Sequence, residues 1–188
     1  LNADGTAKGS HNIADGVGGF SGNLGTSDMF GTSVANIGDL NGDGVMDLAV
    51  GHGFGDDDPV QGGKVWILFM AAGGTVESYV EIQRLTNGFT ADLPKQSYFG
   101  AAIAKVGDLD GDGVVDLAVG APGAPGGDSD TNQGRGSVWI LFMNSDGTVK
   151  SNREIHHDDL GHPMDGSDNF GFSLATLGDL DGDGNPDI

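Results

Sequence analysis

Short apolar segments, separated by polar stretches rich in glycine, set the pattern of this chain. Two runs, 65–70 and 138–143, have the same sequence (Val-Trp-Ile-Leu-Phe-Met) and are apolar at every position. A second pair, the Leu-Ala-Val runs at 48–50 and 117–119, is shorter and ends at a glycine. Apolar runs of this length, bounded by turn residues, are typical of buried β-strands. No helical periodicity is evident, so the pattern predicts an all-β chain.

These runs belong to a larger repeating unit. A Phe-Gly pair occurs three times, with spacings of 69 and 71 residues, and begins at Phe30, Phe99 and Phe170. Each pair precedes a segment with strand-like alternation, at 32–37, 101–106 and 172–177. The Leu-Ala-Val strand, the strong run and a fourth strand after a tight turn complete the unit, and the fourth strand ends at Ile82 or Ile155. Four such strands per unit are typical of a propeller blade.

The repetition amounts to about 2.7 units of roughly 70 residues. Residues 1–13 fit the end of a unit, because Asp4-Gly5-Thr6 matches Asp146-Gly147-Thr148. A closed propeller needs at least about four blades. We therefore expect an incomplete propeller or an open repeat array, in which the chain is a fragment or associates with copies of itself. The expected divisions are the end of a preceding blade with a connecting loop, two repeats and the start of a third, at 1–29, 30–98, 99–169 and 170–188.

An aspartate-rich segment of nine residues begins nine residues after each of these phenylalanines, at 39–47, 108–116 and 179–187. Carboxylate or amide side chains occupy positions 1, 3, 5 and 9, and glycines at positions 4 and 6 let the backbone turn sharply. Oxygen atoms at alternate positions can converge on one hard cation, and the seventh residue offers its carbonyl. A turn without metal is the weaker interpretation, because carboxylates about 4 Å apart repel by about 1–4 kcal/mol per pair.

The spacing differs from that of an EF-hand, which ends in a bidentate glutamate at position 12 and is flanked by helices. Position 12 is Val50 in the first segment and Val119 in the second, and each closing acid stands at position 9. An apolar strand follows directly. The three segments are therefore predicted to be loops between strands.

The stretch from Phe30 to Gly51 (Phe-Gly-x-Ser-Val-Ala-x-Ile-Gly-Asp-Leu-Asn-Gly-Asp-Gly-x-x-Asp-Leu-Ala-Val-Gly) resembles the FG-GAP repeat of the integrin α-subunit β-propeller and its bacterial relatives. The second copy adds Gly120-Ala121-Pro122, and the resemblance covers nearly the whole chain. It implies a seven-bladed propeller with calcium in a hairpin loop of individual blades. Carried onto this sequence, the ligands of up to three calcium ions are Asp39, Asn41, Asp43, the Val45 carbonyl and Asp47; Asp108, Asp110, Asp112, the Val114 carbonyl and Asp116; and Asp179, Asp181, Asp183, the Asn185 carbonyl and Asp187.

The first copy departs from this pattern at two places. Gly51-His52-Gly53 replaces Gly-Ala-Pro, which puts the packing there in doubt. Asn41 also supplies one negative charge fewer than Asp110. We therefore expect the first calcium site to be the weakest.

Composition narrows the setting and the partners. The net charge is −20, and eleven of the 28 acidic residues lie in the three loops. Such a surface repels nucleic acid and anionic lipid, and no apolar run approaches the roughly 18 residues of a membrane span. The chain has no cysteine, so it has neither disulfides nor thiol chemistry. Free calcium is plentiful outside cells, which favours an extracellular or cell-surface location.

Other candidate chemistry is weaker. His156, His157, Asp158, Asp159 and His162 include metal-binding residue types, but a solvated loop is the preferred interpretation because the corresponding segments lack histidine. Trp66 and Trp139 are expected in the core or between blades, and Phe30, Phe99 and Phe170 are expected to pack between neighbouring blades. No catalytic motif is recognisable, so we do not expect an enzyme.

The predicted function is a calcium-binding extracellular module for adhesion or binding. Its protein or glycan ligand is expected to contact the variable loops 51–63 and 120–136. Two alternatives remain: a structural segment of a cell-surface or filamentous assembly, and an accessory domain of a secreted hydrolase or lyase.

Overall fold

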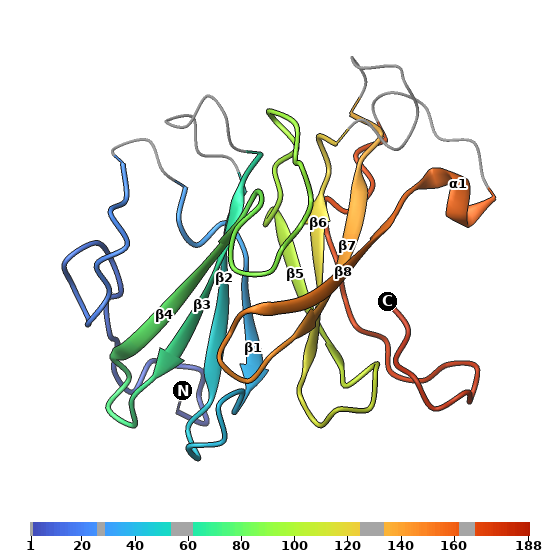
Figure 1. Cartoon of the computed structure of the whole chain (residues 1–188). Coiled ribbons are helices and arrows are strands. Elements are labelled where there is room, and N and C mark those ends of the chain that lie inside the picture. The colour runs from blue at the N-terminus through green and yellow to red at the C-terminus, as the bar shows by residue number, and fades with distance from the viewer. Residues whose placement is uncertain (1, 26–28, 54–61, 125–133, 162–167) are drawn as a thin grey trace.

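The computed structural model describes residues 2–25, 29–53, 62–124, 134–161 and 168–188. Two four-stranded antiparallel sheets stand side by side (Figure 1), with strand orders β1-β2-β3-β4 and β5-β6-β7-β8. The predicted all-β architecture of four-stranded units is confirmed, and the sheets are open. The strands are β1 (Val34–Gly38), β2 (Asp47–His52), β3 (Lys64–Met70), β4 (Val76–Gln83), β5 (Ala102–Gly107), β6 (Asp116–Ala121), β7 (Ser137–Met143) and β8 (Val149–Ile155).

Strand register repeats between the two sheets. Val50 pairs with Trp66 in the first sheet, and Val119 pairs with Trp139 in the second. Irregularities fall at matching places, at the end of β1 and β5 and at the end of β3 and β7. Each repeated sequence therefore forms the same local structure.

The strong apolar runs are buried on both faces of their sheets. In β3, Val65, Ile67 and Phe69 face the second sheet, where they share one core with residues such as Leu117 and Leu141. The alternate residues of β3 face a separate core formed with the N-terminal segment. A sheet covered on both faces needs a continuous apolar strand rather than an alternating one, and this explains the runs at 65–70 and 138–143.

Aromatic side chains pack where the segment that precedes each sheet meets that sheet. Phe89 stacks on Phe99 at a ring-centroid distance of 4.8 Å and meets Trp139 edge-on at 5.3 Å. In the first sheet, the same arrangement joins Phe20 to Phe30 (4.9 Å) and to Trp66 (5.1 Å). The packing role predicted for both tryptophans and for the phenylalanines of the Phe-Gly pairs is confirmed, including the half-buried Phe170, which packs against the outer face of the second sheet.

The glycine of the Phe-Gly pair allows the two repeats to approach each other. Gly100 has φ +93°, and a Cβ atom there would stand 2.4 Å from the carbonyl oxygen of Lys64. Next to it, the Phe99 amide donates to the Gly62 carbonyl (2.7 Å), and the Ser33 hydroxyl donates to the Gly100 carbonyl (2.8 Å). These contacts join the first sheet to the start of the second, where β1 and β5 lie side by side (Figure 1).

Residues 2–6 form the predicted counterpart of the turn at 144–148. The Asn2 amide donates to the Thr6 carbonyl (2.8 Å), just as the Asn144 amide donates to the Thr148 carbonyl (2.8 Å). Asp4 accepts from the Thr6 amide at 3.0 Å, as Asp146 does from Thr148. No strand follows this turn among residues 7–13, in contrast to β8 after the later turn.

The prediction of a strand at 172–177 is wrong. These residues form no strand, and the isolated bridges near them pair Gly136 with Phe170 and Gly178 with Asp187. The strands that pair with β1 and β5 follow their loops, whereas no strand follows the third loop in the residues that the structure describes. A strand needs a hydrogen-bonded neighbour, so the segment stays irregular and Phe172 is 62% exposed.

A four-residue helix, α1 (His157–Leu160), replaces part of the loop that was predicted around the histidines. It ends at Gly161, whose left-handed backbone (φ +65°) is a common helix C-cap. His162 lies outside the described residues. In the part of the chain that the structure describes, no helix is long and apolar enough to cross a membrane.

Candidate metal centre

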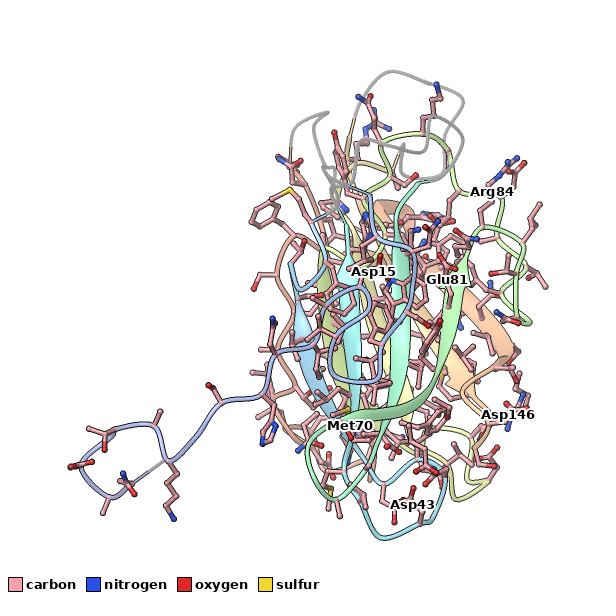
Figure 2. All side chains as sticks on the ribbon, turned by 90° about the vertical axis from the view of Figure 1, so that its left-hand side faces the viewer. Asp15, Asp43, Met70, Glu81, Arg84 and Asp146 are labelled. Carbon is pink, nitrogen blue, oxygen red and sulfur yellow. The ribbon has the colours of Figure 1, made fainter. Side chains whose placement is uncertain are left out.

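The first two aspartate-rich loops connect consecutive antiparallel strands, as predicted, whereas no strand borders the third in the described residues. Loop 39–47 leads from β1 into β2, and loop 108–116 leads from β5 into β6. Both loops and the third one, 179–187, lie at the same end of the molecule (Figure 1). Asp43 marks this end in Figure 2, beyond Met70 at the end of β3.

The first aspartate of each loop organises the backbone of the turn. Asp39 accepts hydrogen bonds from the Asp43 amide (2.9 Å) and the Gly44 amide (2.8 Å). Asp108 and Asp179 accept from the corresponding amides at 2.8–3.1 Å. Three copies of one local sequence thus fold into one loop conformation.

The closing aspartate ties the loop to the third strand of its sheet. Asp116 is fully buried and accepts from the Leu109 amide (2.8 Å) and the Met143 amide (2.9 Å). Asp47 is equally buried and accepts from Leu40 (2.9 Å) and Met70 (3.0 Å). Burial raises the pKa of Asp116 above its ordinary value, against the lowering effect of the two amides.

The third loop lacks the link to a third strand. Asp187 accepts from the Leu180 amide (2.7 Å) and is only half-buried. Leu180 itself is 70% exposed, whereas Leu40 at the same position of the first loop is buried. The local turn therefore forms without the packing that encloses it in the first two repeats.

Carboxylates converge in the second and third loops. Oxygen atoms of Asp108, Asp110 and Asp116 lie within 4.8 Å of one another, and so do those of Asp179, Asp181 and Asp187. Calcium binds oxygen at about 2.3–2.6 Å, so two ligands on opposite sides of one ion stand about 5 Å apart. The donor set and its spread therefore fit a calcium ion. In the first loop, position 3 is Asn41, so an amide stands where the other two loops have a carboxylate.

The aspartate at position 5 lies outside these three-residue clusters and accepts bonds within its own loop. Asp43 accepts from the Val45 amide (2.7 Å) and the Asn41 side-chain amide (2.8 Å). In the other loops, Asp112 and Asp183 accept the corresponding backbone bonds, from Val114 and Asn185 (2.8 Å each). Calcium coordination by the predicted ligands of all three loops stays a prediction.

The second loop contains a cation that the sequence pattern did not reveal. The Lys150 ammonium lies 2.5 Å from Asp110 Oδ2 and also donates to Asp112 Oδ2. These hydrogen bonds raise the pKa of Lys150, and the bond from Lys150 is the main cause that lowers the pKa of Asp112. Lys150 is the second residue of β8 and 34 positions after the end of the loop, so no local motif marks it.

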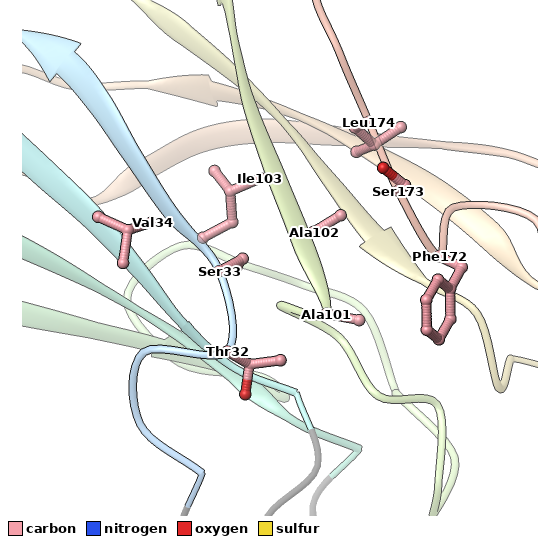
Figure 3. Close-up of a pocket in the computed structure, with 9 residues that line it drawn as sticks. All are labelled: Thr32, Ser33, Val34, Ala101, Ala102, Ile103, Phe172, Ser173 and Leu174. Atoms are coloured by element: carbon pink, nitrogen blue, oxygen red, sulfur yellow. The ribbon is translucent and has the colours of Figure 1, made fainter.

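A groove lies at the start of β1 and β5, the ends of these strands that are opposite to the aspartate-rich loops. Figure 3 shows the residues that line it. It encloses about 410 Å³, and each of the three repeats contributes three consecutive residues to its wall. None of these nine residues is ionisable, so the groove presents small polar and apolar groups. They are Thr32, Ser33, Val34, Ala101, Ala102, Ile103, Phe172, Ser173 and Leu174.

The variable loops predicted to contact a partner fall mostly on 54–61 and 125–133, outside the described residues. Strand β2 shows where the first of these loops begins relative to the aspartates. β2 runs from Asp47 at the calcium loop to His52, about 17 Å at roughly 3.4 Å per residue. The variable loops therefore begin at the end of the sheet remote from the aspartates. His52 is 3% exposed, so this residue belongs to the core and not to a surface loop.

Comparison with known proteins follows the same division of the chain. The sequence profile of the FG-GAP repeat matches residues 30–68 and 99–141. The chain therefore contains two FG-GAP repeats. Each FG-GAP match extends from the Phe-Gly pair through the aspartate-rich loop into β3 or β7, and the third loop lies beyond both matches.

Integrin α-subunits are similar to this FG-GAP chain over most of its length. Integrin alpha-3 from Cricetulus griseus is 36% identical over 162 residues, 85% of the chain and 14% of that protein. Integrin alpha-PS2 from Drosophila melanogaster is 34% identical over 167 residues (86% and 11%). Integrin alpha-IIb from Homo sapiens is 36% identical over 167 residues (85% and 14%). The chain thus spans less than one sixth of these relatives.

Proposed function

We propose that this chain is a calcium-binding module of an extracellular or cell-surface FG-GAP propeller, with a role in adhesion or binding and not in catalysis. The observation that carries the proposal is the carboxylate cluster repeated in the second and third loops, which the buried Asp116 closes in the second loop. The similarity to integrin α-subunits supports a module of this kind. The net charge of −20 argues against nucleic acid as a partner.

The residues that would hold calcium are those at positions 1, 3, 5 and 9 of each loop, with the carbonyl at position 7. When bound, calcium supplies two positive charges that offset the repulsion among the carboxylates, about 1–4 kcal/mol per pair at 4 Å. Extracellular modules bind calcium at about 10⁻⁴–10⁻³ M, which suits a location outside cells.

The closing aspartates give the loops a structural role. Asp116 receives one hydrogen bond from inside its loop and one from Met143 at the end of β7. A loop that is held rigid around a cation therefore fixes the end of the third strand as well. We infer that calcium stabilises the junction of the strands at this end of each sheet.

A structural role in an assembly is the second candidate. Phe172, Leu177 and Leu180 of the third copy are 62%, 56% and 70% exposed. Exposed large apolar side chains in one segment favour contact with a further protein surface, and a second copy of the chain is the surface that this candidate supplies. Equilibrium sedimentation tests this candidate: a mass of one chain at every concentration excludes self-association. An accessory role beside a secreted hydrolase or lyase stays a prediction.

Thermal unfolding with and without calcium tests the proposed function. The protein should melt at a higher temperature in calcium than in chelator, since a ligand that binds only the folded state stabilises it. Asp110→Ala should reduce this gain, because it removes one carboxylate of the second cluster. Asp15→Ala, at an exposed residue remote from the loops (Figure 2), is the matched control and should keep the full gain. Equal melting temperatures in calcium and chelator would contradict the proposal.

A further inference from the structure

The second aspartate-rich loop already contains an internal cation. The Lys150 ammonium contacts Asp110 Oδ2 at 2.5 Å and also contacts Asp112 Oδ2, so one charge bridges two carboxylates. Asp110 is one of the three residues whose oxygen atoms converge, together with Asp108 and Asp116. The ammonium is therefore bonded to an oxygen-bearing group of the candidate calcium cluster itself.

In the first loop, a different side chain bonds to the carboxylate at position 5. Register places Val76 opposite Met70 and Val149 opposite Met143, so Glu77 occupies in β4 the position that Lys150 occupies in β8. Inside the first loop, the Asn41 side-chain amide donates to Asp43 Oδ2 (2.8 Å). Asp43 is at position 5 of its loop, as is Asp112, which Lys150 contacts in the second loop. One donor thus reaches the position-5 carboxylate in each repeat, an amide in the first and an ammonium in the second.

The Lys150 ammonium changes the comparison of formal charge between the first and second loops. The first loop carries three carboxylates, and the second carries four carboxylates with one ammonium, so both carry a charge of −3. The expectation that the first site is weakest counted only the residues of the loops. With Lys150 included, the second loop has no advantage in charge, and calcium has to compete with an ammonium for Asp110.

We propose that Lys150 is a resident cation of the second loop, which stabilises the carboxylate cluster without metal and must leave Asp110 before calcium binds there. The inference rests on the proposed calcium function and deepens it, because it names the residue that sets the affinity of one site. The flexible four-carbon stem of lysine allows its ammonium to move away while β8 stays in place. An isolated surface ion pair contributes little, but this ammonium separates two carboxylates that otherwise repel each other.

Lys150→Gln tests the inference, because glutamine keeps a polar side chain and removes the charge. Calcium is titrated into each protein while the amide signals of Gly113 and Gly44 are followed by nuclear magnetic resonance, which reports the second and first loops separately. We expect the dissociation constant of the second loop to fall roughly two- to fivefold, a change in the range of one exposed ion pair. The first loop should keep its affinity. Lys95→Gln, at an exposed lysine, removes the same charge elsewhere and should leave both loops unchanged.

The melting temperature without calcium gives a second readout. Lys150→Gln should lower it, because four carboxylates then lose their cation, whereas Lys95→Gln should not. A purely structural Lys150 would lower the melting temperature and leave calcium affinity equal or weaker, which would overturn the inference. If calcium binds neither loop of the unaltered protein, the proposed function fails and the competition for Asp110 fails with it. Binding to both loops with no gain in Lys150→Gln overturns only the inference.

Discussion

The buried carboxylate of Asp116 accepts a hydrogen bond from the backbone amide of Met143, 27 positions further along the chain. Asp47 and Met70 repeat this contact in the first sheet at 3.0 Å. The aspartate that closes each of these two loops therefore also connects the loop to the third strand of its sheet by a hydrogen bond. This double role predicts that loop and sheet lose stability together.

Asp116→Ala should lower the free energy of unfolding by about 2–5 kcal/mol, because the amides of Leu109 and Met143 lose their acceptor in a buried site. Urea denaturation measures this loss, which should remain when calcium is absent. Asp146→Ala is the control: its carboxylate accepts only from Thr148 in an exposed turn, and it should cost less than about 2 kcal/mol. Equal, small losses in both variants would show that the contact with β7 carries no stability.

Phe89→Ala should cost about 3–5 kcal/mol, the usual range for a large aromatic residue removed from a core. Phe89 is 1% exposed and contacts both Phe99 and Trp139 at the junction between the sheets. Denaturant unfolding followed by tryptophan fluorescence measures the loss. Phe172→Ala changes the same residue type at a 62% exposed position and should stay within about 0.5 kcal/mol. A mild effect at Phe89 would mean that the junction repacks.

Gly100→Ala should be more destabilising than Gly111→Ala. Both glycines have positive φ (+93° and +77°), a conformation that costs a residue with a side chain about 1–2 kcal/mol. At Gly111 a Cβ meets no atom within 4 Å, whereas at Gly100 it would stand 2.4 Å from the Lys64 carbonyl oxygen. Chemical denaturation of the two variants separates backbone strain from close approach. Equal losses would contradict the tight contact between repeats.

Local patterns made the strands and loops predictable. Asp39, Asp43 and Asp47 form their turn largely from hydrogen bonds inside nine residues, so their spacing alone indicates the conformation. The apolar run at 65–70 likewise becomes a strand because both of its faces are buried, as its composition requires.

Contacts between repeats were less visible in the sequence. The packing role of Phe20 and Phe89 was not predicted, although they stand 69 residues apart and each follows a glycine. A single phenylalanine in a polar stretch does not indicate which aromatic residue it will contact in the folded chain. Lys150 was missed because its partners lie in the loop between β5 and β6, 38 and 40 positions earlier in the chain. The strand predicted at 172–177 was wrong because strand formation depends on a neighbour that a local pattern cannot supply.

A crystal structure of the protein grown in calcium, with an anomalous difference map, tests the central claim most directly. The account predicts a peak in each aspartate-rich loop, at about 2.3–2.6 Å from oxygen atoms of the first, third and closing residues. In the second loop, the Lys150 ammonium should have moved away from Asp110. Water in all three loops at a calcium concentration well above about 10⁻³ M would contradict the account.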